Sequence, residues 1–141
     1  MSAHPPTVTL LFAGLSGLLA VFLGARVTAL RFKLRINVGD GGNEKLIQTI
    51  RVHANNAEYS AIGLVIIGLC EIAAGGGWAI WALAGGLFAG RVLHAQGMIR
   101  TTAPHPSRIV GQTLTWLTIA LAGVYAIYLF VRLYATGTPA T

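Results

Sequence analysis

The chain has 141 residues, of which 55% are hydrophobic and only 10% are charged, with a formal net charge of +6 and a mean hydropathy of +0.68. These values exclude an ordinary soluble domain and are typical of a membrane protein with several spans. The single cysteine, Cys70, cannot build a disulfide framework, and no Cys/His cluster has the spacing of a zinc or haem site, so we expect no metal.

Four apolar segments follow one another along the chain, and each reaches the roughly 20 residues that a helix needs to cross a bilayer. We expect helices over about residues 8–30, 46–72, 78–97 and 107–134. The first segment has no Lys or Arg ahead of it, so it lacks the basic start of a signal peptide and is expected to be retained. Residues 1–141 are therefore predicted to form one all-α integral membrane domain.

Short connections rich in helix-ending residues separate the segments, with the sequences RFKLRINVGDGGNE, AAGGG and MIRTTAPHP. Because short connections join antiparallel neighbours, they predict an up-down-up-down bundle of four transmembrane helices. Small residues recur at helix-packing spacing, as Gly86 and Gly90 do, and also Ala13 and Gly17. We interpret these residues as simple packing positions.

Basic residues gather in or beside the first and third connections, whereas the N-terminal tail and the second connection contain no Lys or Arg. By the positive-inside rule, the first and third connections face the cytoplasm and both chain ends lie on the outer side. The residues concerned are Arg31, Lys33, Arg35, Lys45, Arg100 and Arg108.

The stretch RVHANNAE places Arg51, Asn55 and Glu58 inside the second predicted span. On a helix, positions i, i+4 and i+7 fall within about 60° of one another, so these three residues share one face. The third predicted span runs toward the cytoplasm and carries Arg91 and His94 three residues apart in its last turns. Two spans therefore bring polar side chains to the same depth.

The other two spans contribute at the same level, since Arg108 and Gln112 lie near the start of the fourth and Arg31 near the end of the first. An ionisable group in a bilayer costs about 2.5 to 3.5 kcal/mol even on the lenient insertion scale, so such groups normally face the bundle interior and mark a site. The alternative is that the arginines extend to the headgroups and that Glu58 pairs with Arg51 or Arg91 as a structural contact.

A pocket made of these residues is net positive and holds one carboxylate, Glu58. It suits a ligand that is anionic overall and carries one cationic group. Arginines would bind carboxylates in a forked geometry, and Glu58 could accept from an ammonium group.

Three features follow in order: the RxHxNxxE pattern from Arg51 to Glu58, the string RVLHAQG from Arg91, and Pro104 with Arg108. Together they resemble the MAPEG family, the membrane-associated proteins in eicosanoid and glutathione metabolism. The resemblance covers nearly the whole chain and is closest to small bacterial members. It implies a homotrimer in the bacterial inner membrane that binds glutathione between neighbouring subunits, near the cytoplasmic face.

The resemblance also implies roles for individual residues. Arg108 matches the arginine that stabilises the glutathione thiolate, which then attacks a lipophilic electrophile arriving from the bilayer. We therefore expect a membrane glutathione transferase, with peroxidase as a side activity of the same thiolate. The expected glutathione-binding residues are Arg31, Arg51, Asn55, Glu58, Arg91, His94 and Gln112, with Arg108 as the catalytic residue.

Three positions depart from the mammalian pattern of the family. Ala54 stands where several members have a second arginine, and Met98 and Gln112 stand where members have tyrosines. We therefore do not expect prostaglandin or leukotriene synthesis. A second reading is a non-catalytic membrane protein whose polar cluster is structural or binds an anionic lipid headgroup. A third, a small transporter, has less support because no inverted repeat or broken helix is evident.

Overall fold

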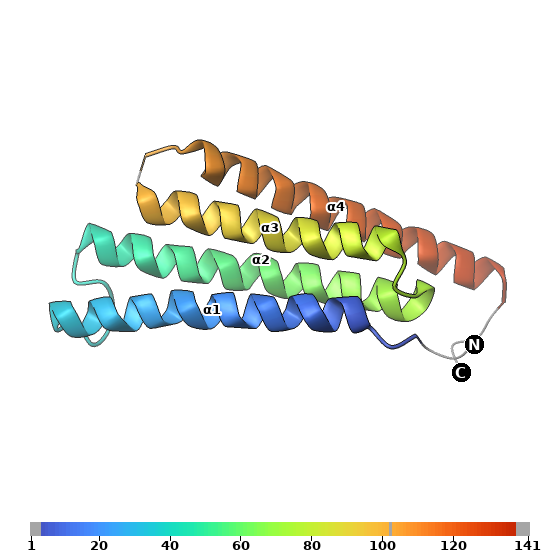
Figure 1. Cartoon of the computed structure of the whole chain (residues 1–141), viewed down its shortest axis with the longest axis horizontal. Helices are drawn as coiled ribbons and strands as arrows, with labels where there is room; N and C mark the ends of the chain where they lie inside the picture. The colour runs from blue at the N-terminus through green and yellow to red at the C-terminus, as the bar shows by residue number, and fades with distance from the viewer. Residues whose placement is uncertain (1–3, 102, 138–141) are drawn as a thin grey trace.

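The computed structural model describes residues 4–101 and 103–137, which form four α-helices joined by short connections (Figure 1). The helices alternate in direction, and the α1–α2 and α3–α4 connections lie together at one end of the bundle (Figure 1). The predicted up-down arrangement of four helices is confirmed, with bounds that differ from the predicted ones by a few residues. The helices are α1 (Thr7–Leu34), α2 (Glu44–Ala74), α3 (Trp78–Arg100) and α4 (Pro106–Ala135).

The beginning of α1 and the end of α4 lie at the opposite end of the bundle, beside the α2–α3 connection (Figure 1). This arrangement agrees with two chain ends on the same side of a membrane. The terminal residues themselves, which the sequence predicts on the outer side, lie outside the described residues. The direction of the bundle across the membrane stays a prediction.

Three helices in the described part of the chain, α1, α2 and α4, are long and apolar enough to cross a membrane. The helix α3 has 23 residues and is not among these candidate spans, because Arg91, His94 and Arg100 lower the hydropathy of its second half. The chain is a membrane protein, and the crossing by α3 stays a prediction.

A carboxylate from α2 caps the start of α1, a contact that the sequence analysis did not anticipate. The first helix follows Pro6 and has no capping hydrogen bond from its own N-cap side chain. Glu71 is fully buried, and its two carboxylate oxygens accept from the backbone N–H groups of Val8 at 2.8 Å and Thr9 at 2.7 Å. Because the first N–H groups of a helix have no partner within it, Glu71 satisfies two of them and ties α1 to α2.

Small residues pack α3 against its neighbours. A Cβ atom at Gly86 would lie 3.0 Å from Thr118 Oγ1 of α4, which agrees with the packing role predicted for Gly86. Gly17 of α1, by contrast, is exposed, and no described atom lies within 4 Å of its Cβ position. Within one chain, Gly17 therefore does not have the packing role predicted for it.

Large apolar side chains cover the outward faces of α1 and α4. Among the exposed ones are Leu18, Val21, Val124 and Ile127. A water-soluble protein rarely exposes so much apolar surface, whereas lipid tails cover it without cost. The outward faces of α1 and α4 therefore suit contact with lipid. The polar side chains gather between α2, α3 and α4.

Candidate functional site

The side chain of Arg91 is fully buried and connects three helices. Its Nη2 donates to Asn55 Oδ1 of α2 at 2.6 Å, and its Nη1 donates to Thr115 Oγ1 and Gln112 Oε1 of α4 at 3.4 and 3.5 Å. The guanidinium also lies 5.2 Å from the ring centroid of Tyr59, within the range of a cation–π interaction. None of these partners is acidic, so the positive charge of Arg91 remains able to attract an anion nearby.

Glycines line the contact between α3 and α4 and allow the two backbones to approach closely. A Cβ at Gly90 would lie 2.7 Å from Thr115 Oγ1, and a Cβ at Gly111 would lie 2.6 Å from the carbonyl oxygen of Gly90. At Gly97 a Cβ would lie 2.5 Å from the backbone nitrogen of Arg108. Any larger side chain would push the helices apart. The packing role predicted for Gly90 is confirmed, and the polar half of α3 lies directly against the first turns of α4.

The start of α4 is held next to His94. His105 caps the helix by accepting from the backbone N–H of Ser107 at 3.3 Å, and Pro106 occupies the first helical position, where its missing N–H costs nothing. The ring Nδ1 of His94 lies 3.1 Å from the carbonyl oxygen of Arg108. Because a carbonyl can only accept, Nδ1 donates, and Nε2 of the neutral ring is left as an acceptor.

A cavity of about 430 Å³ opens between α2, α3 and α4. Its polar side is made of residues that the sequence analysis selected together with Thr113, which it missed, and its other side is apolar or aromatic. Arg91 lies behind this polar side, bonded to Asn55 and Gln112. The polar lining residues are Arg51, Asn55, His94, Arg108, Gln112 and Thr113, and the apolar or aromatic ones are Tyr59, Met98, Ile109 and Trp116.

Two aromatic residues of the cavity were missed from the sequence. Trp116 Nε1 donates to the hydroxyl oxygen of Tyr59 at 3.2 Å, so these side chains connect α4 and α2 across the cavity. A signal for them exists, because Tyr59 follows Asn55 by four residues and Trp116 follows Gln112 by four. Helical spacing of four puts each aromatic on the same face as a selected polar residue.

Glu58 and Arg31 lie outside the cavity of one chain. Glu58 is exposed on α2, and the partly buried Arg31 donates from Nη1 to the carbonyl oxygen of Asn37 at 3.4 Å. From Arg51, the helical rotation is about +40° to Asn55 and +80° to Tyr59, but about −20° to Glu58. The cavity lies on the Asn55 and Tyr59 side, so Glu58 falls at its outer edge. The roles of Glu58 and Arg31 stay predictions.

Two of the three positions that depart from the mammalian pattern line the cavity. Met98 lines the cavity, and its backbone carbonyl accepts from Nε2 of Gln48. Gln112 also lines it and holds Arg91. Ala54 is not among the lining residues described. His53, one position earlier, packs against α1, where a Cβ at Gly24 would lie 3.4 Å from its ring.

Comparison with known proteins gives consistent results. The model of the MAPEG family matches residues 9–128. An inner membrane protein, YecN of Escherichia coli K12, is 32% identical over 114 residues, which cover 81% of this chain and 86% of the relative. The protein of the same name from Escherichia coli O6:H1 gives the same identity and coverage.

Proposed function

Because the chain belongs to the MAPEG family of membrane proteins, we propose that it is a glutathione transferase that joins the glutathione thiolate to lipophilic electrophiles. The observation that carries the proposal is the cavity between α2, α3 and α4, where Arg51, Asn55, His94 and Arg108 converge. Its volume of about 430 Å³ lies within the roughly 300 to 1,000 Å³ of small-molecule sites.

The charges of the cavity suit glutathione, which at neutral pH has two carboxylates, one ammonium group and a thiol. Arg51 and Arg108 line the cavity, and Arg91 adds a third buried cation behind it. Arginines bind carboxylates through paired hydrogen bonds, and Asn55 and the acceptor Nε2 of His94 supply neutral contacts. Glu58 at the outer edge is our candidate for the ammonium group.

Arg108 is the residue that we assign to the chemistry. A positive charge near a thiol lowers the thiol pKa, so more of the bound sulfur is thiolate at neutral pH. The first turn of α4, where Arg108 lies, adds the positive end of the helix dipole. The thiolate sulfur then forms a bond to the electrophilic carbon, and a leaving group such as a halide departs with its electron pair.

The apolar side of the cavity supports a lipophilic second substrate. Ile109 and Trp116 line it and are each 57% exposed on the outward face of α4. A molecule dissolved in the bilayer could therefore reach the sulfur without passing through water. The same thiolate could attack a hydroperoxide, breaking its O–O bond to give the sulfenic acid of glutathione and releasing the alcohol. A second glutathione would then convert the sulfenic acid to a disulfide and water, which is the proposed peroxidase side activity.

A homotrimer in the bacterial inner membrane completes the proposal. Arg51 and Glu58 are both exposed on α2 of one chain, and charges that face lipid are costly. A neighbouring subunit over this face would remove the cost and bring Glu58 to a shared site. The name of the relative YecN supports the inner membrane, and the basic connections support a site toward the cytoplasm.

A second candidate is a non-catalytic protein whose polar cluster is structural or binds an anionic headgroup. The bonds of Arg91 to Asn55, Gln112 and Thr115 favour it, because they use most donors of the guanidinium within the bundle. Native mass spectrometry of the protein, gently solubilised from cells in detergent, separates the two. We expect a trimer that carries glutathione. A monomer without bound glutathione, even after glutathione is added, would favour the second candidate.

A further inference from the structure

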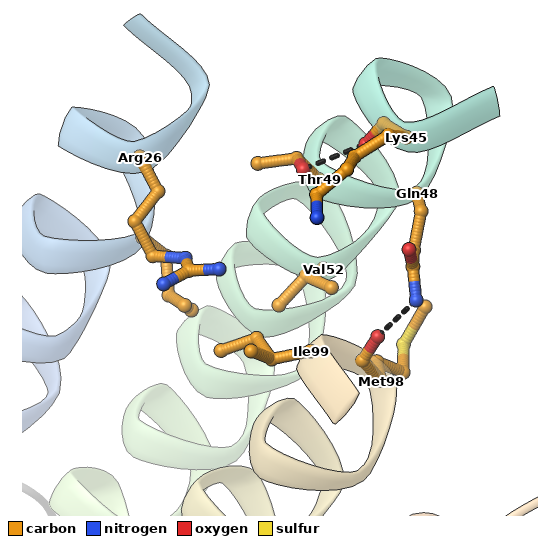
Figure 2. A pocket seen from close by; sticks show the side chains of 8 residues that line it. Arg26, Lys45, Gln48, Thr49, Val52, Met98 and Ile99 are labelled. Carbon is orange, nitrogen blue, oxygen red and sulfur yellow. Dashed lines mark hydrogen bonds between the residues drawn. The ribbon is translucent and has the colours of Figure 1, made fainter. Parts of the chain in front are cut away.

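A second groove lies between the last turns of α1 and the first turns of α2, away from the cavity described above. It has a volume of about 290 Å³ and is lined by Arg26, Ala29, Leu30, Lys33, Lys45 and Thr49. A smaller cavity of about 40 Å³ continues from it and shares Arg26, Lys45 and Thr49. Figure 2 shows the side chains of Arg26 and Lys45 directed from the two helices into the space between them.

The groove concentrates positive charge. Of the described residues that line it, Arg26, Lys33 and Lys45 are cationic and none is acidic. The Thr49 hydroxyl donates its hydrogen to the carbonyl oxygen of Lys45 at 2.7 Å. Three like charges around one groove repel one another, and a bound anion would remove that cost.

Apolar side chains line the groove beside its cations. Ala29 and Leu30 line the groove itself, and Leu23, Val52 and Ile99 line its inner continuation, as Figure 2 shows for the last two. Arg26 lies deeper in α1 than Ala29 and Leu30, so cationic and apolar residues alternate along the groove. Cations beside an apolar wall match an amphiphile with an anionic head and a hydrocarbon body, whereas a small soluble anion would contact the cations alone.

Depth in the bundle agrees with a lipid. The helix α1 ends at Leu34 and α2 begins at Glu44, so the three cations lie within about three turns of these ends. Ends of transmembrane helices lie at the level of lipid headgroups, and basic pockets between helices on the cytoplasmic side suit anionic headgroups. We propose that this groove binds the phosphate of an anionic phospholipid, through Arg26, Lys33 and Lys45.

This site is independent of the proposed glutathione site, since the two share none of their charged lining residues. The simpler alternative is that each cation interacts separately with the anionic surface of the membrane. In that case any two cations at this end of the bundle would contribute equally to the affinity for an anionic lipid. A specific site predicts that the position of the cations matters and not only their number.

The test uses native mass spectrometry of the full chain in detergent, titrated with phosphatidylglycerol or with phosphatidylcholine. We expect the parent to bind phosphatidylglycerol at least roughly 10-fold more tightly than phosphatidylcholine. The double variant Arg26→Gln/Lys45→Gln should lose roughly 30-fold in affinity for phosphatidylglycerol, which corresponds to about 2 kcal/mol for two cations. The control Arg35→Gln/Arg100→Gln removes two charges at the same end of the bundle and should retain the affinity.

Two further measurements, one with a variant and one with inorganic phosphate, complete the test. The exchange Arg26→Lys/Lys45→Arg keeps both charges and should bind like the parent, which separates loss of the site from loss of the fold. Millimolar inorganic phosphate should not displace the lipid. An equal loss in the Arg35/Arg100 control, no preference in the parent, or displacement of the lipid by inorganic phosphate would each overturn the proposal.

Discussion

Arg91 of α3 donates from Nη2 to Asn55 Oδ1 of α2 at 2.6 Å, and this hydrogen bond joins two residues that lie 36 positions apart in the chain. Both groups belong to one polar layer that continues through Gln112 and Thr115 into α4. A buried cation with hydrogen-bond partners on two other helices is held in one place. The polar side of the proposed glutathione site is therefore preorganised before any ligand arrives.

The first prediction concerns the glycine contact that keeps α3 and α4 together. Gly111→Ala should lower the free energy of unfolding by about 1 to 3 kcal/mol, because the added Cβ would press on the backbone of α3 at Gly90. Thermal unfolding in detergent measures the effect. The matched control is Gly123→Ala on the same helix, where no described atom lies within 4 Å of the Cβ position, and it should unfold like the parent. Equal effects of both substitutions would contradict the contact.

The second prediction concerns the cap that Glu71 provides to α1. Glu71→Ala should destabilise the protein by about 1 to 3 kcal/mol, since it leaves the backbone N–H groups of Val8 and Thr9 buried without their acceptor. Glu44→Ala, at an exposed position in the first turn of α2, is the control and should cost a few tenths of a kcal/mol. Thermal unfolding of both variants checks the difference. Equal losses of stability in Glu71→Ala and Glu44→Ala would show that the cap is not important.

The third prediction concerns orientation in the membrane. With Cys70 replaced by alanine, a single cysteine at Val38 should react with an impermeant maleimide only after the cell membrane is permeabilised, because the α1–α2 connection is predicted to face the cytoplasm. Val38 is 88% exposed, whereas Gly41 is unsuitable, since its φ of 57° and a Cβ only 2.8 Å from Ile36 Cδ1 would strain any side chain.

A cysteine at Gly77 is the complementary reporter for that experiment. Gly77 lies in the α2–α3 connection, is exposed and has no described atom within 4 Å of its Cβ position. It should react in intact cells. The reverse pattern, with Val38→Cys reactive in intact cells and Gly77→Cys protected, would invert the assigned topology.

Helical periodicity and the order of the helices were enough to find much of the polar layer. Arg51 and Asn55 lie one turn apart, as do Arg108 and Gln112, so a strict up-down bundle brings them to one level. The contribution of Glu58 could not be decided in this way, because a rotation of α2 by a few tens of degrees moves it into or out of the cavity. Tyr59 had a usable signal in its spacing from Asn55.

Other features depend on contacts that no local pattern contains. The cap of α1 by Glu71 joins residues more than 60 positions apart, and it arises only when the end of α2 packs against the start of α1. Thr115 likewise becomes a partner of Arg91 only because Gly90 and Gly111 let α3 and α4 approach closely. These contacts follow from the relative positions of whole helices.

The fourth prediction concerns the thiol of bound glutathione. An unperturbed thiol has a pKa near 8.5 and is only a few per cent ionised at pH 7. We expect the bound thiol pKa to fall by about one to two units beside Arg108, which would make much of the sulfur thiolate at neutral pH. In Arg108→Ala the pKa should return toward 8.5 and conjugation of an aryl halide should slow at least roughly 10-fold, with partial rescue in Arg108→Lys.

The thiolate absorbance of bound glutathione, titrated against pH, measures that pKa directly. Activity is followed in parallel with a generic aryl halide. An unchanged pKa and turnover in Arg108→Ala would assign thiolate stabilisation to another group, such as Arg31 or the start of α4.

The most direct test of the central claim, that the cavity between α2, α3 and α4 binds glutathione, is isothermal calorimetry of glutathione binding to the solubilised protein. We predict saturable binding by the parent and a loss of roughly 30-fold or more in Arg51→Ala, because removing one partner of a desolvated charge pair costs about 2 to 5 kcal/mol. The control Arg132→Gln removes one positive charge from the far end of α4 and should bind like the parent. Absence of binding by the folded parent, or equal affinities of the parent and Arg51→Ala, would contradict the account.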